Sequence, residues 1–332
     1  MDKKVKIGAA IGVVVLIAAI FCWYHFNVSA KSPEYAIQNV EQALAKHEKE
    51  NVERFVNLDS LLDSAYDDIV AGLIDAEKNM SEDSKEVVKN FSAGLKVPMV
   101  LGLRAATDSF VATGNFDGVS GMTDILQKIG LDKIEYRGTE KIETVEGNES
   151  EAVAHIKIFQ PEFNKEFILE TLLQRDADGN WKVVRFRNFR DFVKEINVVR
   201  RENLQKYLDA SDEIISKHEK IVRDAEQKAG ILSAGNLSSE SFRADLKNLM
   251  TDIKKDWEDR KRELFELPVP KEAETLQGLR IQICDLYVGY VDDYTRWMDD
   301  KKSATLKSAD EKKHRAQNLE TEAAVLAKKL AD

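Results

Sequence analysis

Residues 151–186 read EAVAHIKIFQPEFNKEFILETLLQRDADGNWKVVRF, and this stretch decides the fold class. Apolar residues alternate here with mainly polar ones, which is the period of a β-strand with one buried face. Turn residues stand at Asp178-Gly179-Asn180, and Glu146-Gly147-Asn148 marks an earlier turn. The pattern predicts an antiparallel sheet that buries one face. The alternating runs are 134–136, 152–158, 167–173 and 184–186.

The last hairpin of this sheet has a predicted register. If Asp178-Gly179 form a two-residue type I′ turn, both faces of the two strands are matched. A longer turn would place Lys182 opposite Leu173, which fits the apolar face less well. The expected cross-strand pairs are Leu173 with Val184, Thr171 with Phe186, and Glu170 with Arg187.

Helical patterns come before the strands. Ser32-Pro33-Glu34 is typical of a helix start, because it supplies a capping hydroxyl, a proline for the first turn and an acid for the helix dipole. A second helix is expected over 58–73. Residues 82–112 predict one or two further helices, broken near Gly94 and Pro98. Helices followed by a run of strands predict an α+β domain.

Four amphipathic helical patterns with short linkers follow the strands. Each has an apolar stripe that must be buried, so together they predict an antiparallel up-down four-helix bundle. The charged residues lie between the apolar positions and are expected on the outer faces, in ion pairs. The stripes run over 204–225, 242–264, 276–297 and 316–330. The chain is therefore expected to have three parts: an anchor segment (1–31), the α+β domain (32–198) and the bundle (199–332).

The anchor is predicted from residues 7–30, which contain no Asp, Glu, Lys or Arg and follow three lysines. A run of this length predicts one membrane-spanning helix, in contact with the bilayer through residues 7–27. The lysines favour a cytoplasmic N-terminus, which places the bulk of the chain outside the cytoplasm, at the cytoplasmic membrane. The alternative is a cleaved signal peptide, since Val28-Ser29-Ala30 resembles a cleavage site.

Composition excludes several classes of protein. The 332 residues include 49 Lys and Arg against 59 Asp and Glu, and no basic patch is long enough to follow a phosphate backbone, so no nucleic-acid partner is expected. Cys284 is the only cysteine after the anchor and is expected to be a buried, inert thiol.

Common catalytic and cofactor motifs are missing, so we expect no cofactor, no metal and no enzyme activity. Glu311 and His314 have the spacing of a di-metal bundle ligand pair, but such sites need two copies. Residues 176–180 resemble the start of a calcium loop, yet its twelfth position is Arg187 instead of Glu. His218 lies near an apolar stripe and is expected to be structural.

One candidate binding site remains on the polar face of the sheet. Its charged side chains could line a groove for an anion, or form ordinary cross-strand charge pairs on a wet surface. The second interpretation is the more common one for exposed strand faces. The candidate residues are His155, Lys157, Glu170, Arg185 and Arg187.

Three motifs carry a resemblance to a known family. Residues 32–36 (SPEYA), 56–61 (VNLDSL) and 178–184 (DGNWKVV) with Asn188-Phe189 resemble a family of uncharacterised bacterial membrane-anchored proteins. Their domain is similar to the nuclear-transport-factor-2-like, cystatin-like cone. The resemblance covers about residues 32–198 and implies helices packed in the concave side of a curved sheet. It implies no catalytic residue, because this fold hosts enzymes, binding proteins and scaffolds.

These observations favour a membrane-anchored interaction or scaffold module of the bacterial cell envelope, outside the cytoplasm, with a protein partner. The alternative is a small-ligand-binding protein or an unrecognised enzyme that uses a pocket in the cone. A deep apolar pocket with convergent polar groups would favour the alternative.

Overall fold

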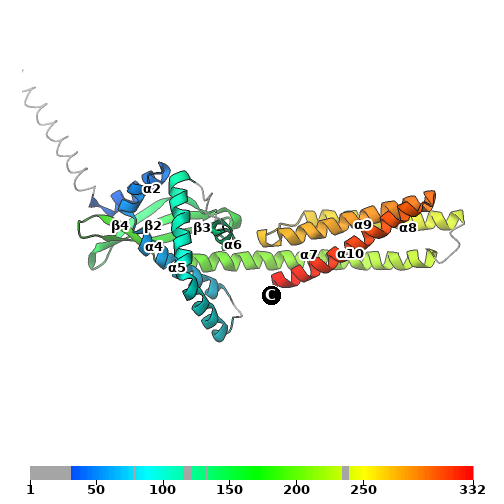
Figure 1. Cartoon of the computed structure of the whole chain (residues 1–332), viewed down its shortest axis with the longest axis horizontal. Helices are drawn as coiled ribbons and strands as arrows, with labels where there is room; N and C mark the ends of the chain where they lie inside the picture. Colours follow the sequence, from blue (N-terminus) through cyan, green and yellow to red (C-terminus); the bar gives the residue numbers. More distant parts are fainter. Residues whose placement is uncertain (1–30, 78–79, 115–120, 132, 234–238, 332) are drawn as a thin grey trace, which may run out of the picture. The chain divides into compact units, whose positions relative to one another are not determined.

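The computed structural model describes residues 31–331 except 78–79, 115–120, 132 and 234–238 (Figure 1). The predicted membrane anchor and cleavage site lie outside the described residues. Within the part that is described, no helix combines the length and the apolar character needed to cross a bilayer. The chain divides into two compact units, Met1–Val199 and Arg200–Asp332.

Unit 1 has the mixed α+β composition expected, with a four-stranded antiparallel sheet in the order β1-β2-β3-β4. Its strands follow its first helices along the chain, and a short 3₁₀ turn, Pro161–Phe163, joins β2 to β3. The helices are α2 (Pro33–Ala45), α3 (Lys49–Phe55), α4 (Leu58–Ala76), α5 (Glu82–Thr113) and α6 (Met122–Lys128). The strands are β1 (Glu135–Val145), β2 (Asn148–Gln160), β3 (Lys165–Arg175) and β4 (Trp181–Phe186).

Side-chain caps start α2, α4 and α5, where the sequence places Ser32, Asn57 and Ser81. The Tyr35 amide donates to Ser32 Oγ at 3.2 Å at the start of α2. The Ser60 amide donates to Asn57 Oδ1 at 3.1 Å at the start of α4. Each cap satisfies a backbone N–H that the first helical turn leaves without a carbonyl.

The apolar face of the sheet carries the main core of unit 1. Leu173 is fully buried, and residues of α2 and α3, among them Ile37 and Phe55, pack against it and against Ala154. Val56 extends the free edge of β4 through a parallel bridge to Val183. The alternation seen in the sequence therefore faces the helices as expected.

The turn of the last hairpin differs from the expected two-residue type. The Asp176 amide donates to the Asn180 carbonyl at 2.8 Å, which leaves a three-residue loop with Gly179 at φ +82°. This loop shifts the strands by one residue, so Leu173 lies opposite Val183, and the expected pair with Val184 is wrong. Three-residue hairpin loops commonly place a glycine in this left-handed conformation.

A bulge between Leu172 and Leu173 restores the expected register in the rest of the hairpin. Thr171 lies opposite Phe186, as predicted. The Arg187 amide donates to the Glu170 carbonyl at 2.7 Å, so these two residues are also opposite each other. The extra residue is absorbed locally, because the apolar face fixes the register on both sides of it.

Helix α5 is continuous through Pro98, and the break expected near Gly94 and Pro98 is wrong. Pro98 has no N–H to donate to the Gly94 carbonyl, which costs the helix one hydrogen bond. Contacts with α4 hold both sides of this gap. Before Pro98, Tyr66 donates to the Ser92 carbonyl at 2.7 Å and Lys96 pairs with carboxylates of α4. After Pro98, Arg104 pairs with Asp59 of α4 at 2.8 Å. Figure 1 shows the joined ends of α4 and α5 extending beyond the sheet.

Unit 2 contains the helices α8 (Glu240–Phe265), α9 (Glu274–Asp300) and α10 (Ser303–Ala331), with a 3₁₀ turn at Lys271–Ala273. The preceding helix, α7 (Phe189–Ser233), passes through the boundary between the two units. Its first turns place Phe192 and Val193 in a core cluster of unit 1, and Tyr207 and Leu208 belong to the core of unit 2. The domain boundary expected after residue 198 thus falls inside a single helix.

Small side chains bring α9 and α10 close together. Ala309, Ala316 and Ala323 recur every seven residues of α10 and are 0%, 0% and 7% exposed. This spacing keeps one side of a helix against its neighbour over many turns. A short connection between the two helices makes them antiparallel neighbours.

We expect the Ala316→Leu substitution to lower the free energy of unfolding by about 1–3 kcal/mol, because the added atoms would push α10 away from α9. Urea denaturation measures this change. The matched control is Ala304→Leu at an exposed position of the same helix away from the groove, which should change stability by less than about 0.5 kcal/mol. Equal effects of the two substitutions would contradict close packing at Ala316.

A buried carboxylate also joins α9 to α10. Burial raises the pKa of Asp293, but the Lys312 ammonium at 2.5 Å and the Ser308 hydroxyl at 2.7 Å outweigh it and hold that pKa below its ordinary value. A carboxyl group with a lowered pKa in the folded state stabilises the fold above its ordinary pKa. That contribution is lost as the pH falls through the folded-state pKa.

We expect Asp293→Asn to cost about 1–3 kcal/mol at neutral pH. The difference from the unsubstituted chain should shrink as the pH falls from about 5 to about 2, measured by denaturation across this range. The neighbouring Asp292 is half-exposed and pairs with Lys254 at 2.8 Å, so Asp292→Asn should cost less than about 1 kcal/mol. A pH-independent loss in the Asp293 variant would contradict the ionic role.

Candidate functional site

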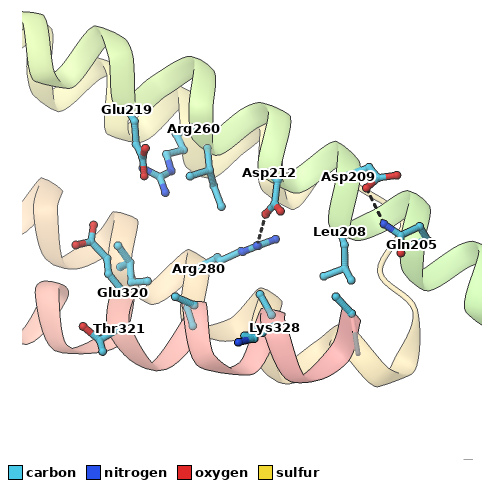
Figure 2. Close-up of a pocket in the computed structure, with 16 residues that line it drawn as sticks. Gln205, Leu208, Asp209, Asp212, Glu219, Arg260, Arg280, Glu320, Thr321 and Lys328 are labelled. Carbon is cyan, nitrogen blue, oxygen red and sulfur yellow. Dashed lines mark hydrogen bonds and ion pairs between the residues drawn. The ribbon is translucent and has the colours of Figure 1, made fainter.

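A groove of about 790 Å³ lies between α7 and α10 in unit 2 (Figure 2). Helices α8 and α9 contribute to its lining through Arg260 and Arg280. Its apolar lining includes Leu208 and Ile215 of α7 and Ile283 of α9. The volume is in the range of sites for small organic ligands.

The groove exists because α10 presents small residues on this side. Ala324 and Ala327 line it, and their short side chains leave space between α10 and α7. The four helices predicted from the sequence are present, but a groove separates the first from the last. The alanines that let α10 pack closely on α9 are too small to fill the space between α10 and α7, so a groove remains there.

Arg280 is buried, and α7 supplies its partners, of which Asp212 lines the groove. It is 5% exposed, donates to the Ser211 hydroxyl and pairs with Asp212 Oδ1 at 2.7 Å. Its guanidinium carbon lies 5.9 Å from the centre of the Tyr207 ring. These contacts compensate its burial.

Arg260 is equally buried, but no described residue accepts a hydrogen bond from it. It is 5% exposed, and its guanidinium carbon lies 4.7 Å from the centre of the Trp257 ring. Its Nε is buried and makes no hydrogen bond. The guanidinium forms no ion pair with any residue that the structure describes. Figure 2 shows its side chain in the groove, with Glu219 of α7 pointing into the same space.

Two other polar groups of unit 2 lie in its interior. His218 is 2% exposed, and its Nδ1 lies 2.8 Å from Asp256 Oδ1. This agrees with the structural role expected for that histidine. Burial raises the pKa of the Cys284 thiol to about 11, so the thiol is protonated and unreactive at neutral pH.

The candidate residues predicted on the sheet lie on its outer face but pair with different neighbours. His155 is opposite Glu170 in the register, yet its Nε2 lies 3.1 Å from Glu143 Oε1 on β1. Lys157 lies 3.9 Å from Glu166 of β3. This arrangement matches cross-strand charge pairs on a wet surface.

The two predicted arginines are both exposed. Burial raises the pKa of the Asp68 carboxyl of α4, and the positive charge of Arg185 lowers it in part. Arg187 lies opposite Glu170 through the backbone, but their side chains form no ion pair in the described structure. The anion-binding groove considered for the polar face of the sheet therefore stays a prediction, and the positions of these side chains do not support it.

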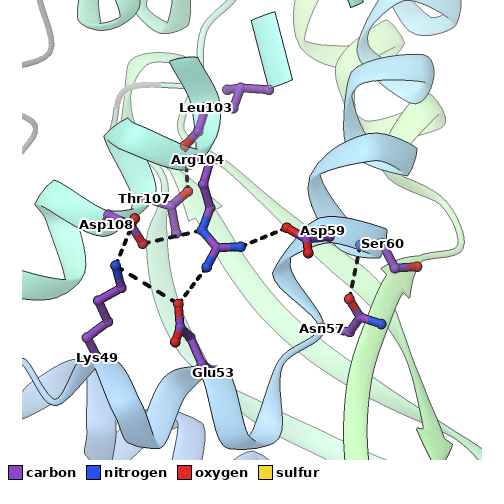
Figure 3. Close-up of polar contacts among 9 residues, drawn as sticks. All are labelled: Lys49, Glu53, Asn57, Asp59, Ser60, Leu103, Arg104, Thr107 and Asp108. Atoms are coloured by element: carbon purple, nitrogen blue, oxygen red, sulfur yellow. Dashed lines mark hydrogen bonds and ion pairs between the residues drawn. The ribbon is translucent and has the colours of Figure 1, made fainter. Parts of the chain in front are cut away.

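A charged cluster joins α3, α4 and α5 (Figure 3). Arg104 of α5 pairs with Glu53 at 2.5 Å, with Asp59 at 2.8 Å and with Asp108 at 3.5 Å. Lys49 pairs with Asp108 at 2.9 Å. Because its charges pair with one another, the cluster fixes the second half of α5 and needs no ligand.

Sequence reasoning missed Arg260 and Arg280, since charges in the helical half were all expected on outer faces. A signal was present. Arg280 lies four residues after Leu276 and three before Ile283, so it falls on the apolar stripe, and Arg260 follows the stripe residue Trp257 by three. A charge inside an apolar stripe indicates a buried polar group.

Among the residues that the structure describes, no three His, Cys, Asp or Glu side chains are grouped so as to hold a metal ion. No family model matches the chain, and no curated protein or solved structure is significantly similar to it. The resemblance to the cone-like membrane-anchored family thus stays a prediction.

Proposed function

We propose that this chain is a membrane-anchored interaction module without catalytic activity, attached to the cytoplasmic membrane of a bacterium by a single span, with both units outside the cytoplasm. An apolar stripe on α5 is the observation that carries the proposal. The cone-like arrangement and the four-helix bundle expected from the sequence belong to the same proposal.

The side chains of the stripe are exposed to solvent, and α5 extends beyond the sheet at its N-terminal end (Figure 1). Soluble monomers rarely expose large apolar patches, and such patches commonly mark interaction sites. Contacts with α4 occupy the opposite side of α5, so the stripe has a fixed orientation. Its most exposed members are Val87 (68%), Phe91 (68%), Val97 (71%) and Leu101 (65%).

The spacing of the stripe fits a second helix. Steps of four and three connect Val87, Phe91, Gly94, Pro98 and Leu101, which is the repeat by which two helices pack along a seam. A Cβ atom at Gly94 would meet nothing within 4 Å, so the approach of a partner is open there. The occupant is therefore an apolar helical stripe of a protein partner.

Charge supports a protein over a lipid surface. The exposed carboxylates of Asp83 and Glu86 flank the first turns of the stripe. An anionic membrane surface would repel them. A partner helix with Lys or Arg near its end would complement them.

The stripe is tested by a photo-crosslinking residue at Val97 of the full chain in cells. We expect a discrete crosslinked protein that disappears in the Phe91→Glu variant, because a charge in the seam would be buried without a partner. Val325 is 66% exposed on α10, and Val325→Glu is the matched control that should leave the crosslink intact. Both variants should fold with unchanged stability, since both positions are exposed.

Crosslinks that persist in Phe91→Glu, or that go only to lipid, would contradict a protein partner on this stripe. A product of twice the chain mass containing only this sequence would identify the partner as a second copy.

The membrane topology has its own test. A reporter active only outside the cytoplasm, fused after Asp332, should be active, because the lysines before residues 7–27 favour a cytoplasmic N-terminus. An N-terminal epitope tag should remain on the same chain if the anchor is not cleaved. Activity of a reporter that works only inside the cell would contradict the proposed location.

A further inference from the structure

We propose that the groove between α7 and α10 is an anion-binding site, whose ligand is a small organic molecule that presents a carboxylate or a phosphate group to Arg260. This site is separate from the stripe on α5 and extends the proposed function.

Arg260 is the residue that requires an anion. Buried guanidinium groups are normally paired with carboxylates, since desolvation of an unpaired charge is costly. Here the Trp257 ring covers one side of the guanidinium, and no residue in the described ranges accepts a hydrogen bond from its buried Nε. An oxyanion with two oxygens fits the planar edge of an arginine through two parallel hydrogen bonds.

The acids near Arg260 are engaged elsewhere or exposed. Asp212 pairs with Arg280 at 2.7 Å, and Asp256 lies 2.8 Å from His218. Glu320 accepts from the Tyr287 hydroxyl at 3.2 Å. Glu219 lines the groove but is exposed to water and forms no ion pair with Arg260 in the described structure. Asp256 Oδ2 is buried and makes no hydrogen bond, but none of these four acids forms an ion pair with Arg260 in the described structure. An external anion therefore has no paired carboxylate to displace from this guanidinium.

The rest of the groove suits an apolar body behind the anionic group. Leu208, Ile215 and Ile283 supply branched apolar walls, and the alanines of α10 leave room opposite them. Pockets that combine apolar walls with a few charged groups are typical of small-molecule sites. The charged group fixes orientation, and the walls supply burial of apolar surface.

Phenyl phosphate and benzoate are suitable probes, and benzyl alcohol is the neutral control of similar size. Titrations use the full chain and are followed by calorimetry and by tryptophan fluorescence, which should respond because Trp257 lies under the guanidinium. We expect saturable binding of one or both anions with a dissociation constant of about 1 mM or lower. A preference between the two probes distinguishes a carboxylate from a phosphate ligand.

Four variants connect the binding to this site. Arg260→Gln should weaken anion binding by about tenfold or more, and Arg260→Lys should restore part of it, because lysine keeps the charge but not the two parallel hydrogen bonds. Glu219→Gln should strengthen binding about twofold to fivefold by removing the competing charge. Arg262 is 62% exposed on the same helix, so Arg262→Gln should leave the affinity unchanged.

Equal affinity for benzyl alcohol, no saturable binding of either anion, or unchanged binding in Arg260→Gln would each overturn the proposal. If Arg260→Gln fails to fold, Glu219→Gln decides, since an unchanged or lower anion affinity in that variant would also overturn it. Loss of crosslinking at α5 in a chain that still binds the anions would show that the two sites are independent.

Discussion

The close approach of α9 and α10 determines the form of unit 2. Alanines at every seventh position let α10 lie against α9, and larger side chains at Ala309 or Ala316 would separate the two helices. Because α10 packs against α9, it does not also pack against α7 along the groove. The groove and its access to Arg260 follow from this one packing arrangement, so residues that no ligand touches decide whether a site exists.

Unit 1 uses polar contacts in a comparable way on α5. Tyr66, Lys96 and the Arg104 cluster hold one side of this helix against α3 and α4. Exposed ion pairs contribute little individually, but a network that spans three helices fixes orientation. The opposite side of α5 is therefore presented to solvent in a defined direction. A surface that is held in place loses less entropy when a partner binds.

The sequence predicted the elements whose signals are local and repeated. Alternation over 152–158 and 167–173 predicted the strands and their buried face, and the pair Thr171 with Phe186 is confirmed. The two-residue turn was wrong, because a glycine-containing turn sequence is compatible with more than one loop length. The bulge that corrects the register depends on packing of both faces, which no short segment reveals.

Tertiary contacts explain the other failures of prediction. Pro98 does not break α5, since α4 contacts the helix before the missing hydrogen bond through Tyr66 and after it through Asp59. Arg260 and Arg280 were expected on outer faces, because charge composition favours exposure and only the position of a stripe argues otherwise. The predicted binding residues therefore lie on the sheet, whereas the buried arginines Arg260 and Arg280 lie in the helical half.

The passage of α7 from one core into the next affects how the chain folds. Starting a helix is costly, whereas extending one adds a hydrogen bond for each residue fixed. Phe192, Val193 and Ile196 secure the first turns of α7 in unit 1, which the ribosome synthesises before unit 2. Those turns form a ready nucleus from which the helix can grow toward Tyr207 as the following residues emerge. Folding of the second unit therefore begins with its costliest local step already completed by the first.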